Sequence, residues 1–107
     1  MEAVLSVHLV PIRLTSERWV HIVENHDDLV GRYHDALEVV AEPDLVLEGK
    51  AGEYLAVRKQ DRRTMVVVYR IVSRTDGFVI TAFQTSKLSQ LVRTKKIIWR
   101  RKLSKKL

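Results

Sequence analysis

The chain has 107 residues, a length that favours one domain, and it holds no cysteine, which excludes disulfides and thiolate metal sites. No apolar run approaches 18 residues, so we expect no transmembrane helix and no membrane partner. Glu2 stands where a secretion signal needs cations, and Pro11 interrupts the apolar stretch that follows. These features predict a cytoplasmic protein.

The formal net charge of +6 is unevenly distributed along the chain. From Arg93 onward there are eight cations and no acid, whereas the first 92 residues hold 11 cations and all 13 acids, a net charge of −2. Such an asymmetry indicates nucleic acid or another acidic surface as partner. The alternative is a tail that only aids solubility. The expected organisation is a single domain over residues 1–92 with a basic C-terminal tail over residues 93–107.

Two helices are expected in the first half of the chain. Residues 5–14 alternate loosely and predict a first strand. Thr15 is suited to cap a helix whose apolar stripe ends at His26. A second amphipathic stripe runs over residues 29–40 and is stopped by Pro43. The short break between the stripes predicts an antiparallel or angled helical pair.

After the second helix the hydrophobic period changes to two, which predicts β-strands. Because the turns between the strands are short, the strands form an antiparallel meander, since parallel pairing needs longer crossovers. The expected fold class is therefore α+β, with two N-terminal helices packed on a three- to four-stranded antiparallel meander sheet. Residues 96–99 are either a further strand or part of an amphipathic end. The strands are expected over residues 45–48, 54–59, 64–72 (TMVVVYRIV, central) and 78–85.

The alternation within these strands suggests how their side chains are arranged. If Leu55 and Val57 face the helices, Arg58 points to the other face of the sheet. A face that carries arginine and threonine suits phosphate binding, and it equally suits an ordinary solvated surface. Along the last strand, four alternate side chains are expected to align: Val79, Thr81, Phe83 and Thr85.

The histidines offer no metal site, and His26 offers acid–base chemistry. His21 and His26 are five residues apart, which separates their side chains by about 140° around a helix. We therefore expect neither metal nor cofactor. His26 ends the first helix, where the helix dipole stabilises an imidazolium. It is either an acid, base or phosphate contact, or a half-buried histidine bonded to a backbone carbonyl.

Several segments occur in a suggestive order. The first expected helix ends in Glu24-Asn25-His26, GEYLAVRKQ leads into TMVVVYRI, and GFVITAFQTS is followed by basic residues. Over residues 14–96 this order resembles the barnase–EndoU–colicin–RelE superfamily of small ribonucleases, especially the BrnT-like toxins and a related phage-associated branch. The resemblance implies a RelE- or barnase-like fold. Asn25 replaces the cation that usually precedes the histidine, and Phe83 replaces a basic residue of BrnT-like sequences.

The resemblance implies a metal-independent endoribonuclease, the toxin of a toxin–antitoxin system or a phage-derived relative. In such a reaction the 2′-hydroxyl of RNA attacks its own phosphate, which requires a base, an acid and donors for the phosphorane charge. His26 would be the acid–base residue, Arg58 the charge stabiliser, and Thr81 with Thr85 or Ser86 the phosphate donors. Further RNA contacts are expected from Arg70, Arg93, Lys95, Lys96, Arg100 and Arg101.

Two other functions stay open at this point. A non-catalytic RNA-binding module is favoured by Phe83 and by the dominance of the basic tail. A structural protein whose tail binds another protein is the third interpretation. RNA is the expected partner. If the chain is a toxin, a cognate antitoxin protein is a second expected partner.

Overall fold

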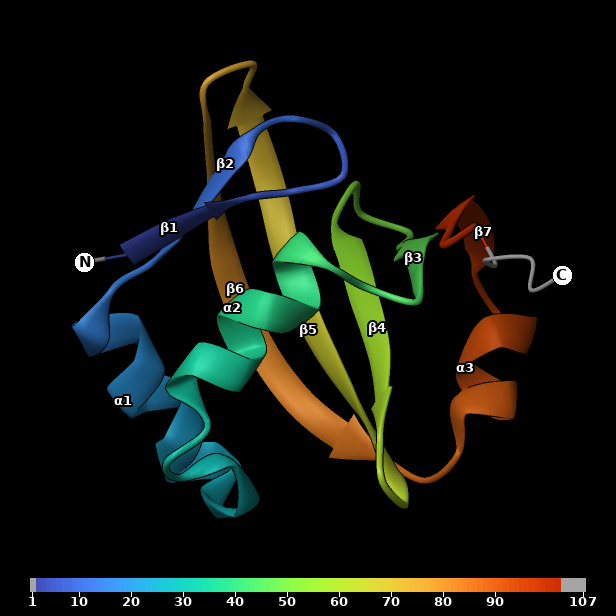
Figure 1. Cartoon of the computed structure of the whole chain (residues 1–107), viewed down its shortest axis with the longest axis horizontal. Helices are drawn as coiled ribbons and strands as arrows, with labels where there is room; N and C mark the ends of the chain where they lie inside the picture. The colour runs from blue at the N-terminus through green and yellow to red at the C-terminus, as the bar shows by residue number, and fades with distance from the viewer. Residues whose placement is uncertain (1, 103–107) are drawn as a thin grey trace, which may run out of the picture.

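The chain begins with a β-hairpin, and the helices follow it (Figure 1). The computed structural model describes residues 2–102. Thr15 caps the first helix as predicted, because its side-chain oxygen accepts from the backbone N–H of Arg18 at 3.0 Å. Within residues 2–102, none of the helices combines the length and the apolar character needed to cross a membrane. The elements of the first half are β1 (Glu2–Leu5), β2 (Pro11–Leu14), α1 (Ser16–Asn25), the 3₁₀ turn η1 (Asp27–Leu29) and α2 (Tyr33–Ala41).

The second half of the chain builds most of a single sheet. Its strand order is β1-β2-β6-β5-β4-β3-β7, and β2 runs parallel to β6 while the other neighbours are antiparallel. The elements of this half are β3 (Leu45–Glu48), β4 (Tyr54–Gln60), β5 (Arg63–Ser73), β6 (Asp76–Thr85), α3 (Leu88–Arg93) and β7 (Lys96–Arg100).

The fold predicted from the sequence, two N-terminal helices on a three- to four-stranded meander, is wrong. Across residues 2–102 the sheet has seven strands, and the parallel β2–β6 pair makes it mixed. The helices follow a hairpin, and α3 adds a third helix late in the chain. The physical reason is strand length: β1, β2 and β7 have only four or five residues each, too few for alternation to define a strand.

Both faces of the sheet are covered, which divides the core into two clusters. α1 and α2 lie on one face, over a cluster that includes Val67 and Tyr69, and α3 lies on the other side of the sheet (Figure 1). The second cluster includes Leu55, Val57 and Val66, and α3 and β7 pack against it. The orientation considered for β4 is therefore reversed, because Leu55 and Val57 point away from α1 and α2.

A β-bulge at Ile80 changes which residues of β6 share a face. Ile80 has no partner residue on β5, because Val79 and Thr81 pair with consecutive residues of that strand. Val79 therefore packs in the cluster beneath α1 and α2, while Phe83 packs in the cluster on the opposite face. The expected alignment of Val79 with the later residues is wrong. From the bulge onward, three alternate residues share the α3 side: Thr81, Phe83 and Thr85.

The loop of the first hairpin places His8 against two tyrosines of the sheet. The Nε2 atom of His8 lies 3.0 Å from the hydroxyl of Tyr69, and its ring centroid lies 4.5 Å from that of Tyr54. Burial raises the pKa of Tyr69, so the hydroxyl stays neutral and donates to the imidazole. Burial also lowers the pKa of His8, which keeps the ring in the neutral form that accepts this bond.

We expect the unfolding free energy to fall as the pH drops below about 6.5, the ordinary pKa of histidine. Because the pKa of His8 is lowered in the folded protein, the unfolded chain binds this proton first, and the loss ends once the folded protein is also protonated. Chemical unfolding at about pH 7.5 and about pH 5.5 measures the difference. His8→Gln should reduce it, and His34→Gln, at an exposed position of α2, should not. If the difference in unfolding free energy between the two pH values were as large in His8→Gln as in the unsubstituted protein, it would not arise from His8.

Residues 93–107, expected as a basic tail, join the fold as far as the structure describes them. Residues 96–100 form β7 and pair with β3, which confirms the strand alternative for this segment. Arg101 donates to the carbonyl of Glu42 at 2.9 Å and lies 3.3 Å from a carboxylate oxygen of Asp44. Residues 103–107 of the expected tail lie outside the described residues. Within the described residues, the basic segment is therefore the end of α3 followed by the edge strand β7.

Candidate functional site

The end of α1 meets the half of β6 that β2 leaves open. β2 pairs with β6 only at Gly77 and Phe78, and beyond these residues α1 and η1 lie along β6 (Figure 1). His26 follows the last residue of α1, and its backbone N–H donates to the carbonyl of Ile22 at 2.9 Å. Its ring centroid lies 6.4 Å from that of Phe83 on β6. This edge brings together an imidazole and an aromatic ring from distant parts of the sequence.

The imidazole of His26 is half-buried and makes no side-chain hydrogen bond within residues 2–102. Its nitrogens reach solvent, because the described residues hold no buried side-chain nitrogen without a partner. The alternative of a histidine bonded to a backbone carbonyl is therefore not what the structure shows. Both ring nitrogens are free to exchange a proton with a ligand.

A shallow cleft of about 400 Å³ opens beside Phe83, between the end of β6 and α3. The backbone N–H of Lys87 donates to Oγ1 of Thr85 at 2.9 Å, which leaves the hydroxyl proton of Thr85 for a ligand. The ammonium group of Lys87 is exposed and has no acidic partner within the described chain. The cleft is lined by Phe83, Thr85, Lys87, Gln90, Leu91 and Thr94.

The other hydroxyl residues expected at the site lie close by in the chain. Thr81 shares the face of Phe83 and Thr85, and Ser86 is exposed in the turn that leads to α3. Three of the predicted catalytic residues therefore lie on the second half of β6 and in the turn that follows it: Thr81, Thr85 and Ser86. His26, at the end of α1, approaches the same strand at Phe83. One predicted catalytic residue is an exception.

Arg58 is the exception, because it lies on the opposite face of the sheet, at the end of α2. Its Nη1 atom donates to the backbone carbonyl of Glu42 at 2.7 Å. Carboxylate oxygens of Glu38 and Glu42 lie 3.9 and 4.0 Å from the guanidinium. A cation at this position satisfies a terminal carbonyl and opposes the negative end of the helix dipole. The geometry gives Arg58 a structural role in holding α2.

Arg58→Ala is expected to lower the unfolding free energy by about 1–2 kcal/mol, because a hydrogen bond between a charged donor and the helix terminus is lost. The arginine side chain is 25% exposed, so water compensates only in part. Arg58→Lys keeps the charge and should lose less. Denaturant unfolding measures both variants, and an unfolding free energy unchanged in Arg58→Ala would contradict the structural role.

Three of the six predicted RNA-binding cations lie beyond the cleft, on α3 and β7. Between Ser86 and Lys102 the chain holds seven cations and no acid. Arg93 ends α3, and Lys96 and Arg100 stand on β7, all three exposed to solvent. This segment forms a continuous basic stretch that begins at the cleft.

Two of the remaining predicted cations lie near the β3–β4 turn. The carboxyl group of Glu53 accepts from the backbone N–H of Ala51 at 2.9 Å. Its own backbone amide and that of Ala51, with Lys95 and Arg70 nearby, hold the pKa of Glu53 below its ordinary range. Arg70 and Lys95 are therefore partly neutralised by this acid, and Arg101 is partly neutralised by Asp44. Within the described residues, the three exposed cations of α3 and β7 have no acidic partner.

Four residues of the cleft were missed by reasoning from the sequence: Lys87, Gln90, Leu91 and Thr94. The spacing of Leu88 and Leu91 was the available signal, since residues three apart share one helical face. This spacing indicates only one turn of helix, and it lies in a segment for which a strand was also considered.

Within residues 2–102, no three side chains of His, Cys, Asp or Glu come together in a way that could hold a metal ion. No protein-family model matches the chain, and the searches of curated proteins and of solved structures found no match.

Proposed function

We propose that this protein is a metal-independent endoribonuclease that binds single-stranded RNA along β6 and α3. The observation that carries the proposal is the free imidazole of His26 beside the ring of Phe83, a residue that lines a cleft together with the exposed cation Lys87. Unstacked bases bind aromatic side chains, so Phe83 supplies a surface for one base. Lys87 and Thr85 supply donors to the adjacent phosphate.

The proposed reaction uses the RNA, one water molecule as proton donor and the side chains of the site. His26 accepts the proton of the 2′-hydroxyl as the 2′-oxygen forms a bond to phosphorus. The bond from phosphorus to the 5′-oxygen breaks, this oxygen takes a proton from the water molecule, and the hydroxide that remains takes the proton from His26. Lys87 and Thr85 stabilise the negative charge on the phosphorane oxygens. The products are a 2′,3′-cyclic phosphate and a 5′-hydroxyl end.

A second candidate function is RNA binding without cleavage. It is favoured by the position of Arg58, which is engaged at the end of α2 and cannot serve the cleft as the expected charge stabiliser. Under this alternative the basic segment and Phe83 bind the strand, and His26 contacts a phosphate. The toxin assignment, with an antitoxin as partner, is supported only by the resemblance in sequence.

The test is incubation of the purified protein with labelled RNA in excess EDTA, followed by separation of the products. Cleavage by the unsubstituted protein supports the ribonuclease, and Lys87→Glu should slow it about tenfold or more, because an anion replaces a phosphate donor. Lys50→Glu, an equal charge change at an exposed turn, is the matched control. Binding without cleavage favours the second function. No association with RNA at low salt would exclude both.

A further inference from the structure

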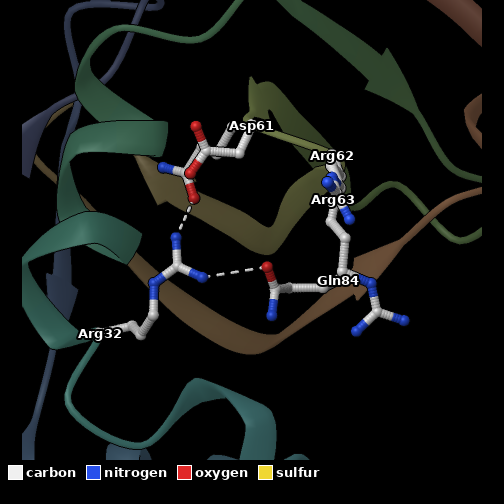
Figure 2. Close-up of a pocket in the computed structure, with 6 residues that line it drawn as sticks. Arg32, Asp61, Arg62, Arg63 and Gln84 are labelled. Carbon is white, nitrogen blue, oxygen red and sulfur yellow. Dashed lines mark hydrogen bonds between the residues drawn. The ribbon is translucent and has the colours of Figure 1, made fainter.

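A second hollow lies on the other side of the end of β6, below the β4–β5 turn (Figure 2). Its volume is about 650 Å³, within the range of small-ligand sites. The two-residue turn brings Asp61 to a positive φ of 52° and places two consecutive arginines at the rim. Its lining is made of Arg32, Gln60, Asp61, Arg62, Arg63 and Gln84.

Arg32 points into this hollow and is held in place by three acceptors. It precedes the first residue of α2, and its Nε donates to Asp35 at 2.8 Å. Nη1 donates to the side-chain carbonyl of Gln84 at 3.0 Å, and Nη2 donates to that of Gln60 (Figure 2). Two of the three acceptors are neutral amides that orient the guanidinium, and the third, the carboxylate of Asp35, offsets part of its charge. The planar guanidinium held in this way keeps its remaining N–H donors for a phosphate.

The hollow retains donors that its own residues do not use. A guanidinium has five N–H donors, and three of those of Arg32 are occupied, which leaves two. The amide nitrogen of Gln60 also has no acceptor within residues 2–102. Arg63 lies 3.8 Å from Asp28, whereas Arg62 has no acidic partner within the described residues.

The hollow and the cleft beside Phe83 are adjacent through two consecutive residues of β6. Phe83 faces the cleft and Gln84 faces the hollow, because neighbouring residues of a strand point to opposite faces. Gln84 also donates to Asp28 at 2.9 Å, two residues after His26. An RNA strand that passes His26 over the open edge of β6 therefore reaches Arg32 with a neighbouring nucleotide.

We infer that the hollow is a second phosphate-binding site, whose ligand is a phosphate group held by Arg32, Arg62 and the amide of Gln60. This inference deepens the proposed ribonuclease, in which the phosphate is the phosphodiester of a nucleotide flanking the one at His26. Free phosphate offers the same chemistry and is the other source.

The first arm of the test is a titration with inorganic phosphate, followed by NMR of the side-chain amide signals of Gln60 and Gln84. We expect saturable shifts of both signals, and about tenfold weaker binding in Arg62→Glu. Arg74→Glu, an equal charge change at the exposed turn on the other end of β5, is the matched control. Arg32→Lys, confirmed as folded by its spectrum, should also weaken binding because the planar fork is lost.

The second arm uses a labelled oligoribonucleotide and separates the two sources of phosphate. Arg62→Glu should reduce the slope of log affinity against log salt by about 0.7 or more, the value for one phosphate contact on a single strand. If phosphate shifts the amide signals but Arg62→Glu leaves the salt slope of RNA binding unchanged, the site is assigned to free phosphate. If phosphate shifts the signals and RNA does not bind at all, the result counts against the ribonuclease alone. Absent shifts, or equal weakening by Arg74→Glu, would overturn the site.

Discussion

His26→Ala is expected to slow RNA cleavage about 10²–10⁴-fold, the contribution of a general base in proton transfer. In the proposed reaction the imidazole beside Phe83 accepts the 2′-hydroxyl proton, and its nitrogens make no hydrogen bond within the described residues. RNA affinity should change much less than the rate, because Lys87 and the basic segment remain. Single-turnover cleavage with saturating protein separates the rate from the affinity.

The control for this variant is His21→Ala, on the same helix. The side chain of His21 is 61% exposed and lies 3.6 Å from Glu24, on a part of α1 that does not line the cleft. It should leave the single-turnover rate unchanged. Equal losses in the two variants would point to damage of α1, and full activity in His26→Ala would remove the imidazole from the mechanism.

Tyr69→Ala is expected to lower the unfolding free energy by about 3–5 kcal/mol, as for other large aromatic side chains removed from a core. Tyr69 is fully buried beneath α1 and α2 in the middle of the longest strand, so its removal leaves a cavity that neighbouring side chains cannot fill. Against a typical stability of about 5–15 kcal/mol, this loss is enough to leave part of the protein unfolded. Denaturant unfolding measures it.

Two further variants separate the ring of Tyr69 from its hydroxyl. Tyr69→Phe keeps the ring and loses the bond to His8, so it should cost about 1 kcal/mol. Val72→Ala, at a position of the same strand that is 59% exposed, should stay within about 0.5 kcal/mol. If Tyr69→Phe were as destabilising as Tyr69→Ala, the hydroxyl and not the packing would dominate.

The longer elements could be predicted from the sequence because each carries its own local signal. Thr15 and the stripe after it define α1, and the expected strand over residues 45–48 coincides with β3. The runs expected over residues 64–72 and 78–85 lie within β5 and β6. α1 has a cap, and β5 and β6 have enough alternating residues to distinguish a strand from a helix, whereas β3 was placed by the change of period after Pro43.

The remaining fold could not be predicted because it depends on tertiary contacts. The parallel pairing of β2 with β6 joins residues that are more than 60 positions apart, and no local pattern encodes it. The bulge at Ile80 shifts the facing of β6 without any glycine or proline to mark it. The run TMVVVYRIV is apolar on both faces because α3 covers one of them, a fact that its own residues do not reveal.

The candidate site, like the fold, was predicted in part. His26 was identified because the end of a helix is defined by its sequence, and the hydroxyls on β6 followed from alternation. The role of Arg58 depended on which face of β4 points to α2, and alternation alone leaves two choices. Lys87 and the Arg32 hollow required knowledge of how α3 and η1 lie against β6.

The most direct test of the central claim is the cleavage, in excess EDTA, of two oligonucleotides that differ at one position. One is all ribose, and the other carries a single 2′-deoxyribose at the nucleotide where the first is cut. The account predicts cleavage of the ribose strand to a 2′,3′-cyclic phosphate, and none at the substituted position, because the attacking 2′-oxygen is missing. Cleavage of both strands at that position, or of neither, would contradict it.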